Sequence, residues 1–336
     1  MESNEGVQNE LIKKISVIII TKNEEHGIQR CFDSVINELM EFKDWEIILV
    51  DSNSTDNTLQ LAKNYPCKIY RIKGNNLSAS LGRYVGTKYA KGEYILYLDG
   101  DMELCPGWLN DALKKLESDV NAAGIIGIRS DIVYDKDLNI LKRIPNYYNI
   151  ASDSIANHFG GAFLARKKII EQVGGYDPRL PSNEEPELHS RILNAGYYIL
   201  QNTKPMIVHH DIKARVTFFG KLKTLYSKRS LGHGLAFKYS FYNRNLKSYF
   251  LRMNDFLIPI FLDIISCLFI IFLIIIPFGG KENYFWLVFF FQTISLLYSI
   301  YNRSGKRYLQ SKVLFVNFII GLLYKVDLKY EVEKIL

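Results

Sequence analysis

Four short apolar runs alternate with helical patterns in the first hundred residues, and this alternation constrains the fold more than any other feature. The runs are Ile15–Ile20, Glu46–Val50, Cys67–Arg71 and Tyr94–Leu98. Between them lie three segments that are long enough for crossover helices: 26–40, 55–65 and 78–90. Strands and helices in this order form βαβ units, whose strands pair in parallel. We therefore expect an α/β fold with a mostly parallel central sheet.

Polar residues follow three of these apolar runs, where ligands of parallel sheets bind. They are 21–25, 51–56 and 99–101. In the last of them, Asp99 and Asp101 are one residue apart, and two neighbouring carboxylates repel each other unless a cation lies between them. Carboxylate oxygens suit Mg²⁺ or Mn²⁺, which also bind substrate phosphates. The pair predicts a metal site that holds a nucleotide diphosphate, although an ordinary acidic turn has the same pattern.

Five stretches, in order across residues 15–200, resemble the family 2 glycosyltransferases, which have the GT-A fold. They are ISVIIITKNEE, EIILVDSNSTDNT, GRYVGTKYAKGEYILYLDGDMEL, GGAFLARKKIIEQVGGYD and EEPELHSRI. The resemblance implies a nucleotide-diphospho-sugar transferase domain with a Rossmann-like sheet. It also implies that a nucleotide sugar is the donor, with a UDP-sugar favoured over a GDP-sugar.

The resemblance assigns the donor-binding residues position by position. Thr21 and Glu24 would line the nucleoside pocket, and Asp51 would bind the base. Arg83 would lie near the diphosphate, although an exposed helix arginine would match the pattern as well.

The resemblance also assigns a metal site. Asp99 would contact the ribose or the metal, and Asp101 would be the principal metal ligand. His209 follows an apolar run and would complete the metal site, as a histidine does in some related enzymes; a structural role is the alternative. The expected cofactor is Mg²⁺ or Mn²⁺.

The stretch EEPELHSR at residues 184–191 resembles the family motif ED-x-D-L-x-x-R. The second acid of that motif is the general base of inverting members, so the resemblance implies that Glu185 takes the proton of the acceptor hydroxyl. Pro186 suits the first turn of a helix, which would place the preceding acids at a helix N-terminus. The alternative is that these acids only complement the helix dipole.

Two long apolar segments occur late in the chain. Leu257–Phe278 has 22 residues with Asp263 as its one charge, and Tyr284–Tyr301 has 18 residues without a charge. A helix needs about 20 such residues to cross a bilayer. The short connection between the segments predicts a membrane hairpin. Both flanks are basic, so the positive-inside rule predicts a multi-pass protein with its catalytic domain on the cytoplasmic face.

The segment 212–254 has ten Lys and Arg residues and no Asp or Glu, in a chain with a net charge of +7. A run of one sign suits an anionic surface. Because the run leads into the apolar hairpin, we expect anionic membrane lipids or an anionic lipid-linked acceptor as its partner, and no nucleic acid. A later apolar stretch, Val313–Tyr324, has only 12 residues and is predicted to be an interfacial helix or a packed helix of the soluble domain.

These observations divide the chain into five parts. We expect a polar tail without a signal peptide (1–14), a GT-A catalytic domain (15–211), a basic juxtamembrane segment (212–254), a transmembrane hairpin (255–302) and a basic C-terminal segment (303–336). The four cysteines form no CxxC pair, as expected in a reducing compartment.

The predicted function is inverting transfer of a sugar to a polyprenyl phosphate or a lipid-linked saccharide during glycan or polysaccharide assembly. One alternative is a processive polysaccharide synthase, but those enzymes carry a QxxRW motif that none of the three tryptophans fits. Another is a membrane protein that binds nucleotide sugars without catalysis. Such a protein would not need Asp99, Asp101 and Glu185 together.

Overall fold

The computed structural model describes residues 14–212, 227–275, 282–302 and 305–336. The contacts within the chain divide these residues into two compact units. The first, called here the sheet unit, contains the described residues up to 179, then 195–212 and 327–336. The second, called the helical unit, contains 180–194 and the described residues from 227 to 326.

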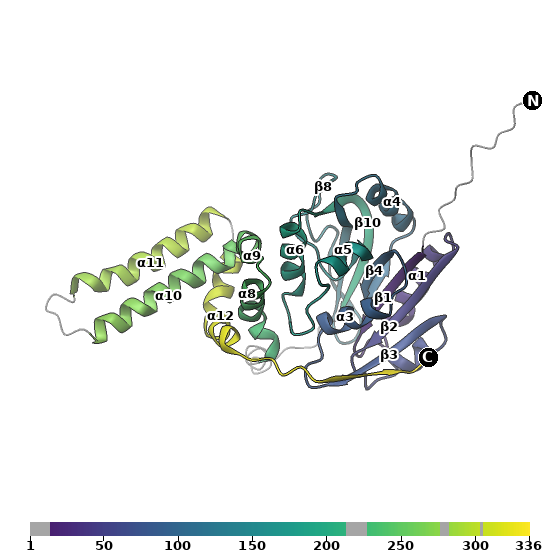
Figure 1. The fold of residues 1–336 in the computed structure, drawn as a ribbon, viewed down its shortest axis with the longest axis horizontal. Helices are drawn as coiled ribbons and strands as arrows, with labels where there is room; N and C mark the ends of the chain where they lie inside the picture. The colour runs from purple at the N-terminus through teal and green to yellow at the C-terminus, as the bar shows by residue number, and fades with distance from the viewer. Residues whose placement is uncertain (1–13, 213–226, 276–281, 303–304) are drawn as a thin grey trace, which may run out of the picture. The chain divides into compact units, whose positions relative to one another are not determined.

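The sheet unit is built on one mixed sheet whose first four sequential strands are all parallel, as predicted (Figure 1). In spatial order, these strands are β3 (Cys67–Gly74), β2 (Asp44–Asp51), β1 (Lys14–Thr21) and β4 (Tyr94–Asp99). The central residues of β1, β2 and β4 are buried on both faces, which explains why these three runs are continuously apolar instead of alternating. The predicted α/β fold is confirmed.

The crossover helices predicted from the sequence are also present. They are α1 (Ile28–Leu39), α2 (Thr58–Ala62) and α3 (Ala79–Tyr89). Two further helices, α4 (Trp108–Glu117) and α5 (Lys167–Gln172), belong to the second half of the unit. Ser78 caps α3 by accepting a hydrogen bond from the Leu81 N–H, which fixes where this helix begins.

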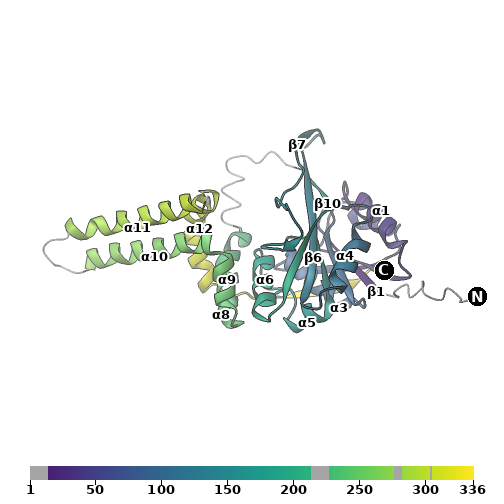
Figure 2. The ribbon, with the colours of Figure 1, turned by 90° about the horizontal axis from the view of Figure 1, so that it is seen from above.

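The second half of the sheet is antiparallel where it joins the first. In spatial order beyond β4 come β9 (Phe163–Arg166), β6 (Ala122–Tyr134), β10 (Tyr198–Ile212) and β5 (Met102–Leu104). β7 (Ile140–Ile144) pairs with β6, and β8 (Ser154–Ile155) pairs with β10. Figure 2 shows β6 and β10 as long neighbouring strands, and they pair in parallel so that His209 is opposite Asp131.

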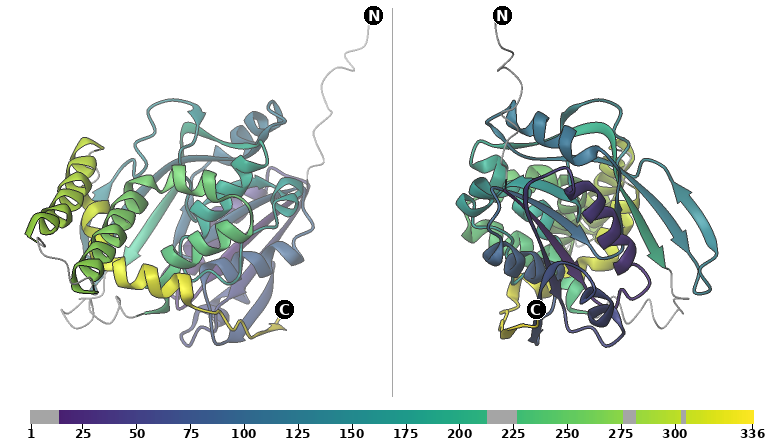
Figure 3. Two further views of the ribbon diagram at one scale, coloured as in Figure 1. Left: turned by 60° about the vertical axis from the view of Figure 1, so that its left-hand side comes forward. Right: turned by 90° about the vertical axis from the view of Figure 1, so that its right-hand side faces the viewer.

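The C-terminal residues form a strand that the sequence did not predict. β11 (Tyr330–Lys334) pairs antiparallel with β3, and Figure 3 shows the yellow end of the chain beside the purple and blue strands of the first half. Within it, Glu333 forms an ion pair of 2.8 Å with Lys73 of β3. The segment 303–336 is therefore not one basic tail, because its last residues complete an edge of the sheet.

The helical unit begins with α6 (Glu184–Asn194), so Pro186 lies in the first turn of a helix, as expected. Its other elements are the 3₁₀ turn η1 (Lys228–Leu231) and the helices α8 (Gly232–Tyr242), α9 (Leu246–Arg252), α10 (Asn254–Ile275), α11 (Glu282–Tyr301) and α12 (Gly305–Leu323). One apolar core includes Leu180, Tyr249, Phe256 and Phe318, which are fully buried. α6 thus shares a unit with the apolar helices, whereas the sequence assigned it to the catalytic domain.

Helices α8 and α12 approach each other through a pair of glycines. A Cβ atom on Gly234 would lie 3.0 Å from the Cα of Gly321, and a Cβ on Gly321 would lie 3.1 Å from the Cα of Gly234. Neither position has room for a side chain. The C-terminal helix is also longer than predicted, since α12 has 19 residues and begins well before the apolar stretch 313–324.

Among the described residues, one helical stretch is long and apolar enough to cross a membrane, Asn254–Phe272 in α10. Trp286–Tyr301 of α11 and Tyr308–Leu323 of α12 are apolar but shorter. Residues 276–281 lie outside the described residues, so the end of the first predicted segment, 276–278, and part of the predicted connection 279–283 are not described. α10 and α11 nevertheless pack side by side in Figures 1 and 2, with the rings of Phe269 and Phe291 5.6 Å apart.

Candidate functional site

The carboxyl ends of β1 and β2 are joined into one rim by hydrogen bonds between their loops. The Asn23 N–H donates to Ser54 Oγ at 2.8 Å, and the Thr55 N–H donates to Asn23 Oδ1 at 2.9 Å. Asn23 and Asn53 have φ angles of 57° and 62°. Asparagine tolerates this left-handed region better than most residues. The polar stretches 21–25 and 51–56 therefore form a single rim.

Two buried oxygen atoms on this rim have no hydrogen-bond partner among the described residues, Thr21 Oγ1 and Asp51 Oδ1. The other oxygen of Asp51 accepts from the Ser54 N–H at 2.9 Å and lies 3.7 Å from Arg71 Nε. A buried polar atom without a partner costs about 1–3 kcal/mol. Both atoms belong to residues that were predicted to bind the nucleoside, and a polar ligand would relieve this cost.

Arg83 and Asp99 form an ion pair at the end of β4. The Arg83 Nη2 donates to Asp99 Oδ1 at 2.8 Å, and the Arg83 guanidinium lies 5.3 Å from the ring centre of Tyr176. Arg83 is only 2% exposed, so the structure excludes the exposed helix arginine that the sequence left open. A Cβ atom on Gly161 would collide with the Asp99 carboxylate and lie 2.9 Å from Arg83 Nη2. The backbone of Gly161 therefore closes over this pair.

Asp101, in the turn between β4 and β5, lies next to His209 of β10. The distance from His209 Nε2 to Asp101 Oδ2 is 3.1 Å, while Asp101 Oδ1 is buried and without a hydrogen-bond partner among the described residues. On its other side, His209 Nδ1 lies 2.9 Å from Arg129 Nη2. Burial alone would lower the pKa of His209, but the hydrogen bond to Asp101 and the charge of that carboxylate raise this pKa overall.

Carboxylates are crowded around Asp101. Burial, followed by the charges of Asp101 and Asp99, raises the pKa of Glu24 to about 8. Such crowding favours a cation, which would lower the electrostatic cost of keeping these groups ionised. The described residues contain no group of three or more His, Cys, Asp or Glu side chains arranged to hold a metal ion. Asp101 and His209 supply two donor atoms whose chemistry fits a divalent cation, whereas one oxygen of Asp99 is bound to Arg83.

The residues around His209 were missed by the sequence analysis. Arg129 and Asp131 both lie on β6, where Arg129 Nε donates to Asp131 Oδ1 at 2.6 Å, and Asp131 is 3.6 Å from His209 Nδ1. No local pattern marks them, because they reach His209 only through the pairing of β6 with β10. Arg71 was missed for the same reason, since β3 brings it to Asp51.

Glu185 lies in the helical unit, whereas the other predicted site residues lie in the sheet unit. The neighbouring acid Glu187 is fully buried, and its carboxylate accepts hydrogen bonds from Arg191 at 2.6 Å and from Asn243 Nδ2 at 3.1 Å. The acids of α6 thus differ in environment. Glu187 ties α6 to α8, while Glu185 lies in the first helical turn and is not fully buried.

Comparison with known proteins agrees with this geometry. Residues 16–174, which include the rim, Arg83 and the Asp99–Asp101 turn, match the sequence model of the glycosyl transferase family 2. This part of the chain is a family 2 glycosyltransferase domain. The resemblance seen in the sequence is confirmed.

Curated relatives of this glycosyltransferase domain include two enzymes from distant organisms. Poly(ribitol-phosphate) beta-N-acetylglucosaminyltransferase TarP of Staphylococcus aureus is 34% identical over 167 residues, which cover 48% of this chain and 50% of TarP. Glycosyltransferase AglE of Haloferax volcanii is 22% identical over 193 residues, 54% of this chain and 62% of AglE. The chain thus spans between half and two thirds of the length of these two relatives.

Solved glycosyltransferase structures share the fold. The mannosyltransferase PcManGT from Pyrobaculum calidifontis has a TM-score of 0.53 at 14% identity, covering 93% of this chain and 88% of that one. Residues 1–349 of Staphylococcus aureus TarS give a TM-score of 0.51 at 16% identity, covering 72% of this chain and 73% of that one. At these identities, the likeness concerns the fold alone.

Proposed function

We propose that this glycosyltransferase moves a sugar, with inversion, from a nucleotide-diphosphate sugar to a lipid-linked acceptor at a membrane. The proposal rests mainly on three buried side-chain oxygens that have no hydrogen-bond partner among the described residues. They belong to Thr21, Asp51 and Asp101, which lie at or just after the ends of neighbouring strands in the family 2 domain. Buried polar atoms in proteins are normally paired. Three unpaired oxygens along one edge of a sheet indicate that a polar ligand completes them.

The donor would extend along this edge. Asp51 Oδ1 and Thr21 Oγ1 would receive the polar groups of the nucleoside, and Arg83 would hold the diphosphate while paired with Asp99. Asp101 and His209 would hold Mg²⁺ or Mn²⁺, which would supply positive charge for the departing diphosphate. The TarS structure was solved with UDP-GlcNAc, and the PcManGT structure with GDP-Man and Mn²⁺. These complexes support a nucleotide sugar and a divalent cation as ligands of this chain.

Glu185 would be the general base. It would accept the proton of the acceptor hydroxyl as the oxygen forms a bond to the anomeric carbon. The bond between that carbon and the donor phosphate would break on the opposite face, and its electron pair would leave with the nucleoside diphosphate. Arg83 would lie beside this developing negative charge, and preorganised charge of this kind lowers the barrier.

The helical unit supports a membrane-bound acceptor. Its helix α10 contains the candidate span Asn254–Phe272, and α11 is apolar over Trp286–Tyr301. We propose that α10 and α11 enter the membrane together, with the sheet unit on the cytoplasmic face because the basic segment precedes α10. A second acceptor class is suggested by TarP, whose name specifies a poly(ribitol-phosphate) acceptor. A soluble polyol-phosphate polymer therefore belongs in the same experiment.

The test is a donor and acceptor panel with the full chain in membranes. UDP-sugars and GDP-sugars are supplied with Mn²⁺ or with a chelator, together with polyprenyl phosphate, a lipid-linked saccharide or a polyol-phosphate polymer. We expect one donor to be consumed, with one lipid product heavier by one sugar and of inverted anomeric configuration. If a donor were consumed only in the presence of the polyol-phosphate polymer, the lipid-linked acceptor would be excluded. If no donor were consumed with any acceptor, the proposed function would be excluded.

Glu185→Gln separates the two kinds of lipid acceptor. A hydroxyl must lose its proton during attack, whereas a polyprenyl phosphate is already anionic. We expect the variant to lose about 10²–10⁴-fold in transfer to a hydroxyl and to retain transfer to a lipid phosphate. Donor binding should stay unchanged in both cases. Undiminished transfer to a hydroxyl would rule out Glu185 as the base.

A further inference from the structure

An open apolar pocket with a volume of about 440 Å³ lies at the surface of the helical unit, between α8, α9 and α10. Its lining residues are Phe237, Leu246, Lys247, Phe250, Leu251 and Phe261. Cavities that bind small ligands have volumes of about 300–1,000 Å³ and mostly apolar walls. This pocket, called here the chain slot, has one charged residue in its lining, Lys247.

One wall of the chain slot belongs to the candidate membrane span. Phe261 lies inside Asn254–Phe272 of α10, so the slot is continuous with the surface of a helix that suits a bilayer. At the slot itself, Leu251 is 62% exposed. Exposed apolar surface of this kind is stabilised by a hydrocarbon neighbour and not by water. The slot therefore fits an occupant that comes from the membrane.

Three basic residues lie in or next to the helix that forms most of the slot. Lys247 is exposed, Arg244 is exposed in the turn before α9, and Arg252 at the end of α9 is partly buried. Burial lowers the pKa of Arg252 to about 10. The segment 212–254, which contains all three, has no Asp or Glu. An anionic group next to a hydrocarbon chain would complement them.

The helices of the slot are hydrogen-bonded to the helix that carries Glu185. Asn243, at the end of α8, donates to Glu187 of α6 at 3.1 Å. Asn245, at the start of α9, donates to Ser190 of α6. Both asparagines thus connect the slot to α6 within one unit. A lipid held in the slot would be attached to the same body as the proposed base.

We propose that the chain slot binds the hydrocarbon chain of the lipid-linked acceptor, with Lys247 at its rim facing the phosphate of that lipid. The inference rests on the proposed function, since it names the part of the acceptor that the helical unit recognises. It assigns the acceptor to the helical unit and the donor to the sheet unit. It also predicts selectivity for long chains, because a short chain leaves the slot unfilled.

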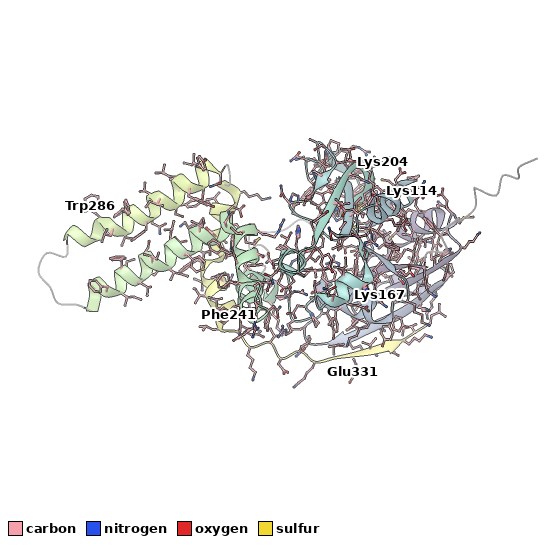
Figure 4. All side chains as sticks on the ribbon, turned by 45° about the horizontal axis from the view of Figure 1, so that its top comes forward. Lys114, Lys167, Lys204, Phe241, Trp286 and Glu331 are labelled. Carbon is pink, nitrogen blue, oxygen red and sulfur yellow. The ribbon has the colours of Figure 1, made fainter. Side chains whose placement is uncertain are left out.

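The binding experiment uses the full chain in phosphatidylcholine nanodiscs and a long-chain polyprenyl phosphate as the probe. Lys247→Glu and Leu251→Glu change exposed side chains that line the slot. Lys306→Glu and Phe241→Ser are the matched controls, because Lys306, at the start of α12, is exposed and does not line the slot, and Phe241, labelled in Figure 4, is 65% exposed and does not line it either. We expect at least about 10-fold weaker binding in both slot variants and unchanged binding in both controls.

Three outcomes would overturn the inference. Equal weakening in all four variants would indicate general attraction to the membrane surface. Equally strong competition by phosphatidylglycerol would indicate that bulk anionic lipid occupies the slot. Unchanged binding in both slot variants would show that the chain lies elsewhere. Leu251→Trp, which fills the slot without adding a charge, keeps the test valid if Leu251→Glu does not fold, because it should also weaken binding of the long chain.

A transfer assay separates this inference from the proposed function. Acceptors with the same headgroup and either a long or a short isoprenoid chain are compared in the wild-type protein and in Leu251→Glu. We expect the wild type to have a KM about 10-fold lower for the long chain and the variant to lose this preference. If transfer had the same KM for long-chain and short-chain acceptors, the slot inference would be excluded and the proposed function would stand. If no nucleotide sugar were consumed with any acceptor, the proposed function itself would be excluded.

Discussion

Three acids at the edge of the sheet unit and two acids of the helical unit lie in different electrostatic environments. In the sheet unit, Glu24, Asp99 and Asp101 are crowded together, and one oxygen of Asp101 has no hydrogen-bond partner among the described residues. In the helical unit, Glu187 is paired with Arg191, and Asp263 of α10 is paired with Lys312 of α12. The three crowded acids concentrate negative charge that a cation would balance, whereas Glu187 and Asp263 are each paired with a cation of their own unit.

Exposed cations complete the contrast. The helical unit presents Arg244 and Lys247 to its surroundings, in a segment without acids. The same chain therefore offers a negative site that suits a metal-bound diphosphate and a positive, apolar surface that suits an anionic lipid. In both units, the proposed ligand carries a charge opposite to that of the side chains that would receive it, a cation at Asp101 and an anionic headgroup at Lys247.

The largest effect is expected from Asp101→Ala. Because Asp101 is the predicted principal ligand of the cation, its loss should lower the rate of donor consumption by about 10³-fold or more. The measurement is nucleoside diphosphate release with Mn²⁺ present. Asp137→Ala is the control, since the Asp137 side chain is 61% exposed. If the Asp101 variant consumed the donor at the wild-type rate with a chelator present, Asp101 would not hold a catalytic cation.

The next effect concerns the paired acid Glu187. Glu187→Ala leaves Arg191, whose side chain is 10% exposed, without its carboxylate and should destabilise the helical unit by about 3 kcal/mol. Hydrogen exchange should accelerate in α6 and α8 and stay slow in β1 and β2. Glu187→Gln keeps a hydrogen-bond acceptor for Asn243 and should therefore destabilise the helical unit less than Glu187→Ala does. Equal acceleration in both units would show that they unfold together and that Glu187 does not act locally.

A smaller effect is expected where three apolar helices meet. Lys312 donates to Asp263 and to Gln292 Oε1, the latter at 2.9 Å, and Gln292 donates to Asp263 at 2.8 Å. Lys312→Met leaves the Asp263 charge unpaired among apolar side chains and should cost about 2 kcal/mol. Adding Asp263→Asn should recover part of this loss. Proteolysis of the membrane-bound protein, followed by mass analysis of α12, measures both changes; no recovery in the double variant would contradict the pairing.

The smallest effect is the pH dependence of Glu24. Its folded-state pKa of about 8 lies above the ordinary value of 4.5, so its cost to stability is absent below about pH 4.5 and grows as the pH rises to 8. Glu24→Gln should therefore raise the melting temperature at pH 8, without divalent cation, and leave it unchanged at pH 4.5. Glu24 is half-buried, so solvent screening reduces the expected gain to about 1 kcal/mol. Glu41→Gln, at an exposed position, serves as the control. If Glu24→Gln raised the melting temperature equally at both pH values, the Glu24 carboxylate would not be destabilised by its neighbouring carboxylates.

Much of the sheet unit was predictable because its first strands are each specified by a short run of neighbouring residues. Each apolar run of the first four strands, such as Ile15–Ile20, becomes a buried parallel strand, and the polar residues after it reach the carboxyl edge of the sheet. That edge brings Thr21 and Asp51 together as register partners without any further information. The partners of His209 were not predictable, because Arg129 is 80 residues away in sequence and the contact depends on strand pairing.

The division of the chain into two units could not be predicted from the order of segments in the sequence. The acids at 184–191 follow the family domain in sequence, yet α6 packs with α8 and α9 through Asn243 and Asn245. The last residues follow the apolar helices, yet β11 returns to β3. Both outcomes depend on contacts between distant segments, which no local pattern encodes.

The parallel sheet, the polar edge and the apolar helices follow from local sequence, because hydrophobic periodicity and strand-end residues act over a few neighbouring positions. The pairing of charges, in contrast, depends on the tertiary fold. That fold left oxygens of Asp51 and Asp101 without partners, gave Glu187 an arginine, and opened a slot beside Lys247. The physical reason is that burial and pairing depend on what surrounds a side chain, and its surroundings come from distant parts of the chain.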